Sequence, residues 1–341
     1  MRIRAIALLI SVYCIPAFYT GCSLEDDEIS GEQDRHNVVL LCRKDASSAT
    51  LSEIRHSDIF IFNDNPLKRL DSYQHSEGGG PVKAASRRGD KIMVAIANAP
   101  IPSDGWRSVN SYEGIQEEIS LLQNEDPECP VMSGEAMISS GSDEMHYVEM
   151  ERLVSEIRIN SIRTDFSGRE YDGEPLTDVR IYLTNVNASC KYLKKDGFSP
   201  EMIVNPGFLD MDALSGFKDR SLLYAETEDI GEETLYPGIK LFCYPNDSPE
   251  ETPGSPFTRL VIEGKISGHT YWYPVTINRG DFGIASGGDG KGIGRNMCYT
   301  YDFTILRTGT SDPDIPVCKD DISVTCMVEP WKEMENETVT F

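Results

Sequence analysis

The segment that most resembles a ligand-binding motif is a glycine-rich run over residues 283–294, GIASGGDGKGIG. Backbone N–H groups of such a loop can cradle a phosphate. A phosphate-binding loop also needs glycine five residues before its Gly-Lys pair and Ser or Thr directly after it, where this chain has Ala285 and Gly292. Because a strand rather than a helix is expected next, a hairpin loop is the better interpretation.

Acidic and aromatic residues offer further candidates. With 56 Asp and Glu in the chain, a glycosidase-type carboxylate pair cannot be singled out. Four clustered acids are the best candidate calcium ligands, although solvated loop residues are the favoured interpretation: Asp312, Asp314, Asp320 and Asp321. Three tryptophans could stack on sugars, but their wide separation favours core packing: Trp106, Trp272 and Trp331. We predict no catalytic residue, no metal site and no cofactor.

Nine cysteines occur without a repeating spacing, at positions 14, 22, 42, 129, 190, 243, 298, 318 and 326. No C-x-x-C pair is present, which argues against a zinc ribbon or a thioredoxin-like redox site. Many of them lie in apolar alternations, where cysteine behaves as a small hydrophobic residue. We expect mostly free, buried thiols, while a disulfide that includes Cys318 stays open.

The first residues have the pattern of an export signal. Arg2 and Arg4 form a positive segment, and a short apolar stretch follows. The run YTGC that ends at Cys22 resembles a bacterial lipobox, in which the cysteine thiol receives the lipid. Residues 1–21 are therefore predicted to be a signal peptide, with Cys22 as the lipidated first residue of the mature chain. An ordinary cleavage site is the alternative.

An acidic stretch follows Cys22. Residues 25–28 are Glu-Asp-Asp-Glu, and we predict a solvated tether over 22–35. Such a run directly after a lipidated cysteine resembles the surface-export signal of Bacteroides-type lipoproteins. We expect an outer membrane lipoprotein precursor displayed on the cell surface.

The overall composition excludes several classes of protein. The 341 residues carry 32 Lys and Arg against 56 Asp and Glu, a formal net charge of −24. Nucleic-acid binding needs a basic face that neutralises phosphates, and no basic cluster compensates here. A hydrophobic content of 39% is enough to build cores. After the first 21 residues, no apolar run approaches the ~20 residues that a membrane-spanning helix requires.

Alternation of apolar and polar residues is the main structural signal. In the clearest case, Tyr299, Tyr301, Phe303 and Ile305 share one face of a strand. Each such row predicts a strand with one face in a core and the other toward water. Strands are predicted within 37–42, 58–62, 91–97, 153–159, 179–183, 259–263, 271–277, 299–305 and 322–328.

Helices are predicted in only two places, over 111–123, where Asn110 is the expected cap, and over 210–217. The sum is an all-β chain with minor helices, most simply two β-sandwich domains. The stretch before residue 145 is rich in loop-forming residues, and strand-like sequence resumes at 153. We therefore predict an N-terminal sandwich over 36–151 and a C-terminal sandwich over 152–341.

Several short segments carry a resemblance to a known family. The first are MVAIANAP at 93–100 and PVMSG at 130–134, and residues 148–157 follow. They resemble the V-x-A-N-A, P-M-S/T-G and L-x-R-x-V-A-K-I elements of the fimbrillin family, the pilins of type V fimbriae, with Glu156 in place of the lysine. Further matches follow in the family's order, at 241–246, 258–262, 295–299 and 328–331.

This resemblance implies two transthyretin-like β-sandwiches and a structural or adhesive function. An Arg-specific protease would cut after the first strand and leave a groove of unpaired backbone groups. A strand from another fimbrial subunit would fill the groove, and head-to-tail filling grows a fibre without any catalytic residue. The implied partners are other fimbrial subunits, the outer membrane through lipid on Cys22, and an unidentified surface receptor. The implied final location is the fimbrium.

Cleavage after the first strand has two candidate positions, Arg43 and Arg55. We prefer Arg55, because cleavage there removes the whole connecting loop with the departing strand. Residues 322–328 and 338–341 are candidate donor strands, or they complete the C-terminal sandwich. Stalk, tip and anchor roles stay open, and an anchor would keep its first strand.

Two functions of other classes also stay open. A surface carbohydrate-binding lipoprotein would be marked by an exposed tryptophan platform on one face. A secreted β-sandwich hydrolase would be marked by a cleft that holds two carboxylates about 5–9 Å apart.

Overall fold

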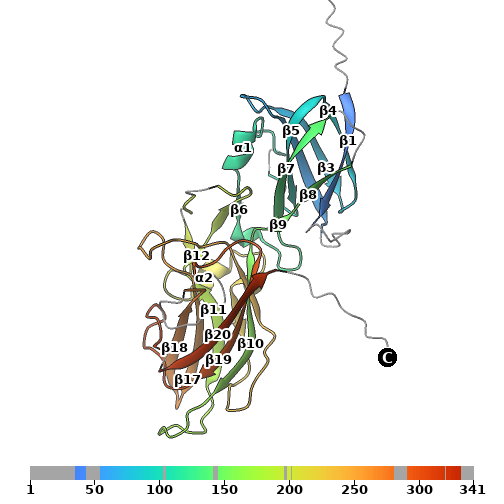
Figure 1. Cartoon of the computed structure of the whole chain (residues 1–341). Helices are drawn as coiled ribbons and strands as arrows, with labels where there is room; N and C mark the ends of the chain where they lie inside the picture. Colours follow the sequence, from blue (N-terminus) through green and yellow to red (C-terminus); the bar gives the residue numbers. More distant parts are fainter. Residues whose placement is uncertain are drawn as a thin grey trace, which may run out of the picture. The chain divides into compact units, whose positions relative to one another are not determined.

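The computed structural model describes residues 35–43, 54–102, 105–140, 145–195, 198–200, 202–279, 290–318 and 320–331. Figure 1 shows their helices and strands. The predicted signal peptide, Cys22, nearly all of the tether and the candidate donor segment 338–341 lie outside these residues. So does most of the glycine-rich run.

The N-terminal strands form two sheets. Their bounds are β1 (Arg35–Arg43), β2 (His56–Asn63), β3 (Leu70–Glu77), β4 (Val82–Arg87), β5 (Gly89–Ala97), β7 (Met132–Ser140), β8 (Met145–Glu149) and β9 (Glu151–Arg152). One sheet has the order β4-β1-β8, and the other has the order β3-β2-β5-β7-β9. The predicted strands at 37–42, 58–62 and 91–97 are confirmed as β1, β2 and β5.

Strand β2 is buried on both faces. Ile59 and Ile61 pack into a core cluster shared with β1, whereas Phe60 and Phe62 belong to a second cluster on the opposite face. There the Trp106 ring meets Phe60 edge-on, with ring centroids 5.5 Å apart. A strand covered on both faces reads as a continuous apolar run, which explains the sequence DIFIF.

The C-terminal strands also form two main sheets. Their bounds are β10 (Ser155–Thr164), β11 (Thr177–Thr184), β15 (Tyr224–Glu226), β16 (Lys240–Cys243), β17 (Arg259–Ile266), β18 (His269–Thr276), β19 (Met297–Ile305) and β20 (Ile322–Pro330). The orders are β16-β10-β19-β20 and β15-β11-β17-β18. Two short pairs add β12 (Val186–Asn187) to β14 (Ile203–Val204), and β6 (Ile119–Leu121) to β13 (Ser189–Lys191).

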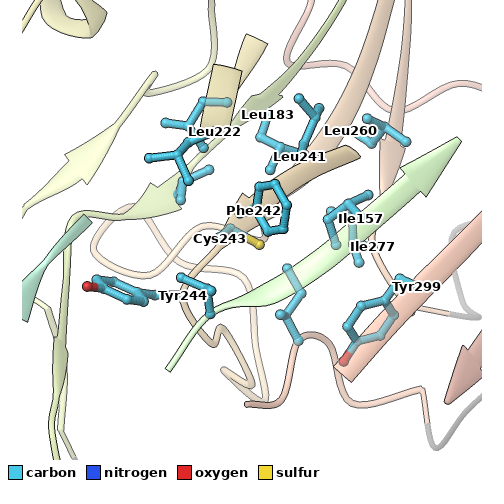
Figure 2. Packing of buried hydrophobic residues seen from close by; sticks show 14 of the residues in the cluster. Ile157, Leu183, Leu222, Leu241, Phe242, Cys243, Tyr244, Leu260, Ile277 and Tyr299 are labelled. Carbon is cyan, nitrogen blue, oxygen red and sulfur yellow. The ribbon is translucent and has the colours of Figure 1, made fainter. Parts of the chain in front are cut away.

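The core between these sheets contains the aromatic row predicted from the sequence. Tyr299, Tyr301, Phe303 and Ile305 of β19 are all buried, and the Tyr301 and Phe303 rings are stacked 5.6 Å apart. Figure 2 shows Tyr299 in this core together with side chains from β10, β11, β16 and β17. Burial of one complete strand face is what period-two alternation predicts.

The same strand order occurs twice along the chain. Strand β1 pairs antiparallel with β4 and parallel with β8, while β10 pairs antiparallel with β16 and parallel with β19. In the facing sheets, β3-β2-β5-β7 corresponds to β15-β11-β17-β18. The chain is therefore an all-β protein with a duplicated sandwich topology. The transthyretin-like detail and the division into two domains stay predictions.

The first predicted helix is wrong beyond its first turns. Helix α1 spans Tyr112–Glu117, and its N-cap is Ser111, which accepts a hydrogen bond from the Gly114 N–H, rather than Asn110. The chain then forms β6 and the 3₁₀ turn η1 (Leu122–Asn124). Pairing of β6 with β13 replaces the helical hydrogen bonds, so a distant partner overrides the local spacing.

The second predicted helix is confirmed in a shorter form, as α2 (Met211–Leu214), which Asp210 caps. A 3₁₀ turn, η2 (Arg220–Leu222), follows it.

The stretch expected to be loop-rich before residue 145 contains β7, so that expectation is wrong. The strand is difficult to predict because it contains Gly134, and glycine is unfavourable inside a strand. A Cβ at Gly134 would lie 2.0 Å from the Glu149 carbonyl oxygen, so only glycine fits this close backbone approach. The predicted boundary at residue 151 falls within β9, which pairs with β7.

Most of the described cysteines are buried thiols, as the sequence analysis expects. Among the described residues, Cys129, Cys190, Cys243, Cys298 and Cys326 are buried thiols outside any disulfide, and Cys318 is an exposed thiol. Among the described residues, no helix is long and apolar enough to cross a membrane.

Candidate functional site: the first strand and the chain that follows it

Strand β1 is the middle strand of its three-stranded sheet. Val38 and Leu40 point into the core below it, with 1% and 0% of their surfaces exposed. They pack in one cluster with Ile59 and Ile61 of β2 and with side chains of β4, β5 and β7. The strand therefore joins its two neighbours through backbone hydrogen bonds and closes the core with its apolar side chains.

The pairings of β1 show what its removal would expose. Its register with β4 runs from Arg35↔Arg87 to Leu40↔Val82, and its register with β8 runs from Val39↔Met145 to Arg43↔Glu149. Without β1, both neighbours would present unpaired N–H and C=O groups along a groove with an apolar floor. Such a groove accepts another strand by β-augmentation, because pairing satisfies the edge groups and alternate side chains fill the floor.

Arg55 lies directly before β2, at the end of the connection from β1. Its guanidinium is exposed and donates a hydrogen bond of 2.9 Å to Oδ2 of Asp126. Both residues line a hollow of about 460 Å³, together with Asn98, Cys129 and Lys218. The preferred cleavage residue is therefore held against an acidic partner that the sequence analysis did not single out.

The backbone around Arg55 is also held. Its N–H donates to Oδ1 of Asn98 at 3.0 Å, and its carbonyl accepts from the Gly78 N–H at 2.7 Å. Asn98 has φ of 60°, a left-handed conformation that asparagine tolerates better than most residues, and its Nδ2 donates to the Pro130 carbonyl. The asparagine of the V-x-A-N-A element thus fixes the start of β2. A protease must loosen these bonds to extend the chain at Arg55.

Asp126 is the electrostatic centre of this hollow. Partial burial alone would raise its pKa, but hydrogen bonds from Lys218, the Glu128 N–H and Arg55 hold that pKa below its usual value. The Lys218 ammonium lies 3.0 Å from the same oxygen that Arg55 contacts. Asp126 is therefore ionised near neutral pH and binds two cations from different parts of the chain.

The other predicted site residues do not join this cluster. Arg43 is the last residue of β1, where it pairs with Glu149 of β8, and its side chain lies outside the description. Cys22 lies outside the described residues. The partners of Arg55 were missed because Asp126 and Lys218 carry no local motif. Only Asn98 had a sequence signal, through the element at 93–100.

Four of the segments that carry the family resemblance meet in one cluster. The buried Arg152 guanidinium lies over the Trp331 ring, 4.3 Å from its centroid, and 3.5 Å from Oδ1 of Asn296. The Trp331 ring also stacks on the Phe242 ring, with ring centroids 5.6 Å apart. The Trp331 N–H donates to the Asn296 carbonyl at 2.8 Å. These motifs therefore tie β9, β16 and the end of β20 together.

The alternative sites receive no support from the described residues. Trp106 is buried, while Trp272 donates to Glu263 and Trp331 stacks as above, so the three tryptophans do not share an exposed face. Among the described residues, no group of three or more His, Cys, Asp and Glu is placed to hold a metal ion. Of the candidate calcium ligands, Asp314 instead binds Arg259 at 2.6 Å.

Comparison with solved structures identifies the same fold elsewhere. A candidate cell adhesion protein from Bacteroides eggerthii has a TM-score of 0.64 and 15% identity, over 87% of this chain and 96% of that chain. A fimbrilin from Porphyromonas gingivalis W83 has a TM-score of 0.61 and 16% identity, over 86% and 97%. A tip fimbrial protein from Porphyromonas gingivalis, solved with a C-terminal truncation, has a TM-score of 0.53 and 14% identity, over 87% and 100%.

No protein-family model and no curated protein sequence matches the chain. At these identities the structural matches establish the fold. The chain is fimbrillin-like in fold, over almost the whole length of the structures it matches.

Proposed function

We propose that this chain is a structural or adhesive subunit of a type V fimbria and that it assembles by strand exchange. The observation that carries the proposal is the position of β1. It is the middle strand of a three-stranded sheet, and an arginine-containing connection separates it from β2. The fold shared with a fimbrilin and with a tip fimbrial protein supports the same function.

The proposed export pathway begins with the lipoprotein signal. Lipid on Cys22 holds the precursor at the outer membrane, and the acidic tether directs it to the cell surface. Cleavage after Arg55, or less favourably after Arg43, would then release β1 together with the lipid. The remainder of the chain would pass from the membrane into the fimbrium.

The groove that β1 would leave sets the requirements for the donor strand. The donor strand must pair with both β4 and β8, and it must place apolar side chains where Val38 and Leu40 now lie. Strand β20 pairs with β19 along its whole length, from Met297↔Pro330 to Ile305↔Ile322. It would have to leave that sheet to act as a donor, which favours a segment after β20.

The proposed assembly needs no catalytic residue, and we infer that the chain is not an enzyme. The energy of assembly comes from backbone pairing and from apolar burial in the groove. Head-to-tail filling does not close on itself, so each added subunit leaves a new groove at the growing end.

The test is limited proteolysis of the surface-displayed protein with an Arg-specific protease, followed by sequencing of the new N-terminus. A new N-terminus at His56, with SDS-resistant ladders that form afterwards, supports a polymerising subunit. The ladders should disappear in Arg55→Ala and persist in the matched variant Arg43→Ala. An intact N-terminus without ladders contradicts polymerisation and favours an anchor, which keeps its lipid and its first strand.

A further inference from the structure

A hollow of about 1050 Å³ lies in the C-terminal half of the chain, away from Arg55 and its partners. Most of its wall comes from three separate segments: β13 with the residues after it, the connection between β16 and β17, and the residues that lead into β19. The rest comes from Asn187, Asn278, Val328 and strand β19 itself. This volume suits a ligand of several sugar rings or a short peptide. Nothing in the proposed strand exchange uses it.

The charge of this hollow is opposite to that of the whole chain. The chain has 32 Lys and Arg against 56 Asp and Glu. Among the described residues that line the hollow, the only acid is Asp247, against five cations: Lys191, Lys194, Lys195, Lys291 and Arg295. A concave site of one charge sign concentrates ligands of the opposite sign. The prediction that no basic cluster exists is therefore incomplete, because folding gathers one from distant segments.

Most of the lysines already contact acids at the rim. Lys191 and Lys195 bind Glu117, and Lys194 lies 2.8 Å from Glu151. Both acids are well exposed, with 64% and 48% of their side-chain surfaces accessible. At Lys194 and Lys195 both partners are exposed, so these ion pairs are weak and an incoming anion can replace their carboxylates at little cost. Lys191 is only 10% exposed and also donates to the Glu117 carbonyl at 2.6 Å, so it stays in place.

Arg295 is different because its bonds leave its charge uncompensated. Its guanidinium donates to the carbonyls of Tyr192, at 2.8 Å, and of Lys191, and to Sγ of Cys190. These acceptors are neutral, and no carboxylate of the described residues pairs with it. Its position is therefore fixed by the backbone of β13 and the residue that follows, while its positive charge remains available to a ligand.

Neutral polar groups and one aromatic ring complete the lining. Side-chain amides and hydroxyls come from Asn187, Ser189, Ser248 and Ser255, and the Phe198 ring lies 5.3 Å from the Lys191 ammonium. Hydroxyls and amides bind sugar hydroxyls, and an aromatic face packs on the apolar face of a sugar ring. Cations among such groups select a sugar that carries carboxylate or sulfate.

We propose that this hollow binds an anionic oligosaccharide through carboxylate or sulfate groups. The proposal names a receptor chemistry for a surface subunit, and its biological setting rests on the proposed function. Anchoring by Arg295 and steering by the rim lysines predict binding that weakens as salt rises. The neutral polar lining predicts discrimination against anions that have no hydroxyl groups.

The test measures binding to the purified full-length protein by titration calorimetry at low ionic strength. The probes are a sulfated heparin oligosaccharide, a carboxylated hyaluronan oligosaccharide, a neutral maltooligosaccharide and an oligoglutamate peptide. We expect one or both anionic sugars to bind, and their order tells whether sulfate or carboxylate is the preferred group. The neutral sugar and the peptide should bind more weakly.

The variant Lys194→Ala/Lys195→Ala should weaken anionic-sugar binding about five- to tenfold, because it removes two rim charges. The matched control is Lys83→Ala/Lys265→Ala, which removes two cations outside the hollow and should leave affinity within about twofold. If neither anionic sugar binds at millimolar concentration, the proposal is overturned. Equal loss in both variants also overturns it, as does tighter binding of the peptide, which would assign the hollow to an acidic polypeptide.

The experiments can contradict strand exchange and anionic-sugar binding independently of each other. The rim variant should still form SDS-resistant ladders after proteolysis, because no residue that lines the hollow belongs to β1, β4 or β8. Loss of ladders with intact sugar binding would contradict strand exchange alone. Intact ladders without sugar binding would contradict this inference alone.

Discussion

Strands β1 and β10 occupy the same place in the duplicated topology, but the cores that they complete differ. The inward side chains of β1 are Val38 and Leu40, and all described members of their cluster lie between residues 38 and 150. The inward side chains of β10 are Ile157, Ile159 and Ile162, which belong to the larger cluster that also includes residues of β2, β17 and β19. Strand β10 therefore contributes to a larger hydrophobic core than β1 does.

The sheet that contains β10 is also larger than the sheet that contains β1. Strand β10 lies in a four-stranded sheet in which β20 extends the far side of β19, whereas the β1 sheet stops at β4 and β8. A bulge at Asn160 shifts the register of β10 and keeps Ile162 in the core. Removal of β1 opens one small core, while removal of β10 would open the main one. The proposed strand exchange would therefore be less costly at β1 than at β10.

The largest effect is expected in the main core. Phe303→Ala removes a buried, stacked ring, and it should lower the free energy of unfolding by about 3–5 kcal/mol. The matched control is Thr304→Ala, half-buried on the opposite face of β19, with an expected loss below about 1 kcal/mol. Urea denaturation measures both, and equal losses would contradict the assigned register.

The next effect tests the comparison directly. Leu40→Ala should cost about 2–4 kcal/mol, because it leaves a cavity below β1. Hydrogen exchange should then show faster opening in β1, β4 and β8 than in β10 and β19. The matched change Ile159→Ala in β10 should instead loosen the whole structure. Identical exchange patterns for the two variants would refute the difference between the strands.

A smaller effect is expected at Glu125, which contacts both Val131 and Tyr244. Glu125 is buried, and its carboxylate accepts hydrogen bonds from the Val131 N–H at 3.0 Å and from the Tyr244 hydroxyl at 2.8 Å. Burial raises the pKa of Glu125 to about 7, although both hydrogen bonds oppose that change. The folded protein thus keeps a proton that the unfolded chain releases near its ordinary value of 4.5.

Because the folded state binds more protons between these pH values, its stability should fall as pH rises from 4.5 to about 7, by roughly 2–3 kcal/mol. Glu125→Gln should flatten this dependence, whereas the exposed control Glu128→Gln should not. Thermal unfolding across this pH range gives the measurement. An unchanged slope in Glu125→Gln would show that another group is responsible.

The smallest effect concerns the start of β2. Asp126→Asn removes the acidic partner of Arg55, so cleavage after Arg55 should become faster by about 1.5- to 5-fold, in keeping with a weak exposed ion pair. The matched control is Asp178→Asn, which breaks an exposed ion pair with Lys265 elsewhere. Initial cleavage rates measure the difference. A slower rate in Asp126→Asn would mean that the ion pair presents Arg55 to the protease.

Local residue patterns are sufficient to predict the all-β class and the strands with strict alternation. Residues 299–305 form a strand with one buried face, because alternation is a local property of the chain. The lipobox pattern and the acidic tether are also local, and they stay predictions. Strands such as β4 and β7 escaped prediction because small residues and glycine weaken their alternation.

The pairing of strands and the contacts between charged residues depend on tertiary packing and could not be predicted from the sequence. The residues of 119–121 have helical spacing, yet they form β6 because β13 supplies a partner. Asp126 binds Arg55 and Lys218, and Arg295 reaches the carbonyl of Tyr192, although long segments of chain separate these residues. Such contacts depend on how distant segments pack together, and no local pattern encodes that packing.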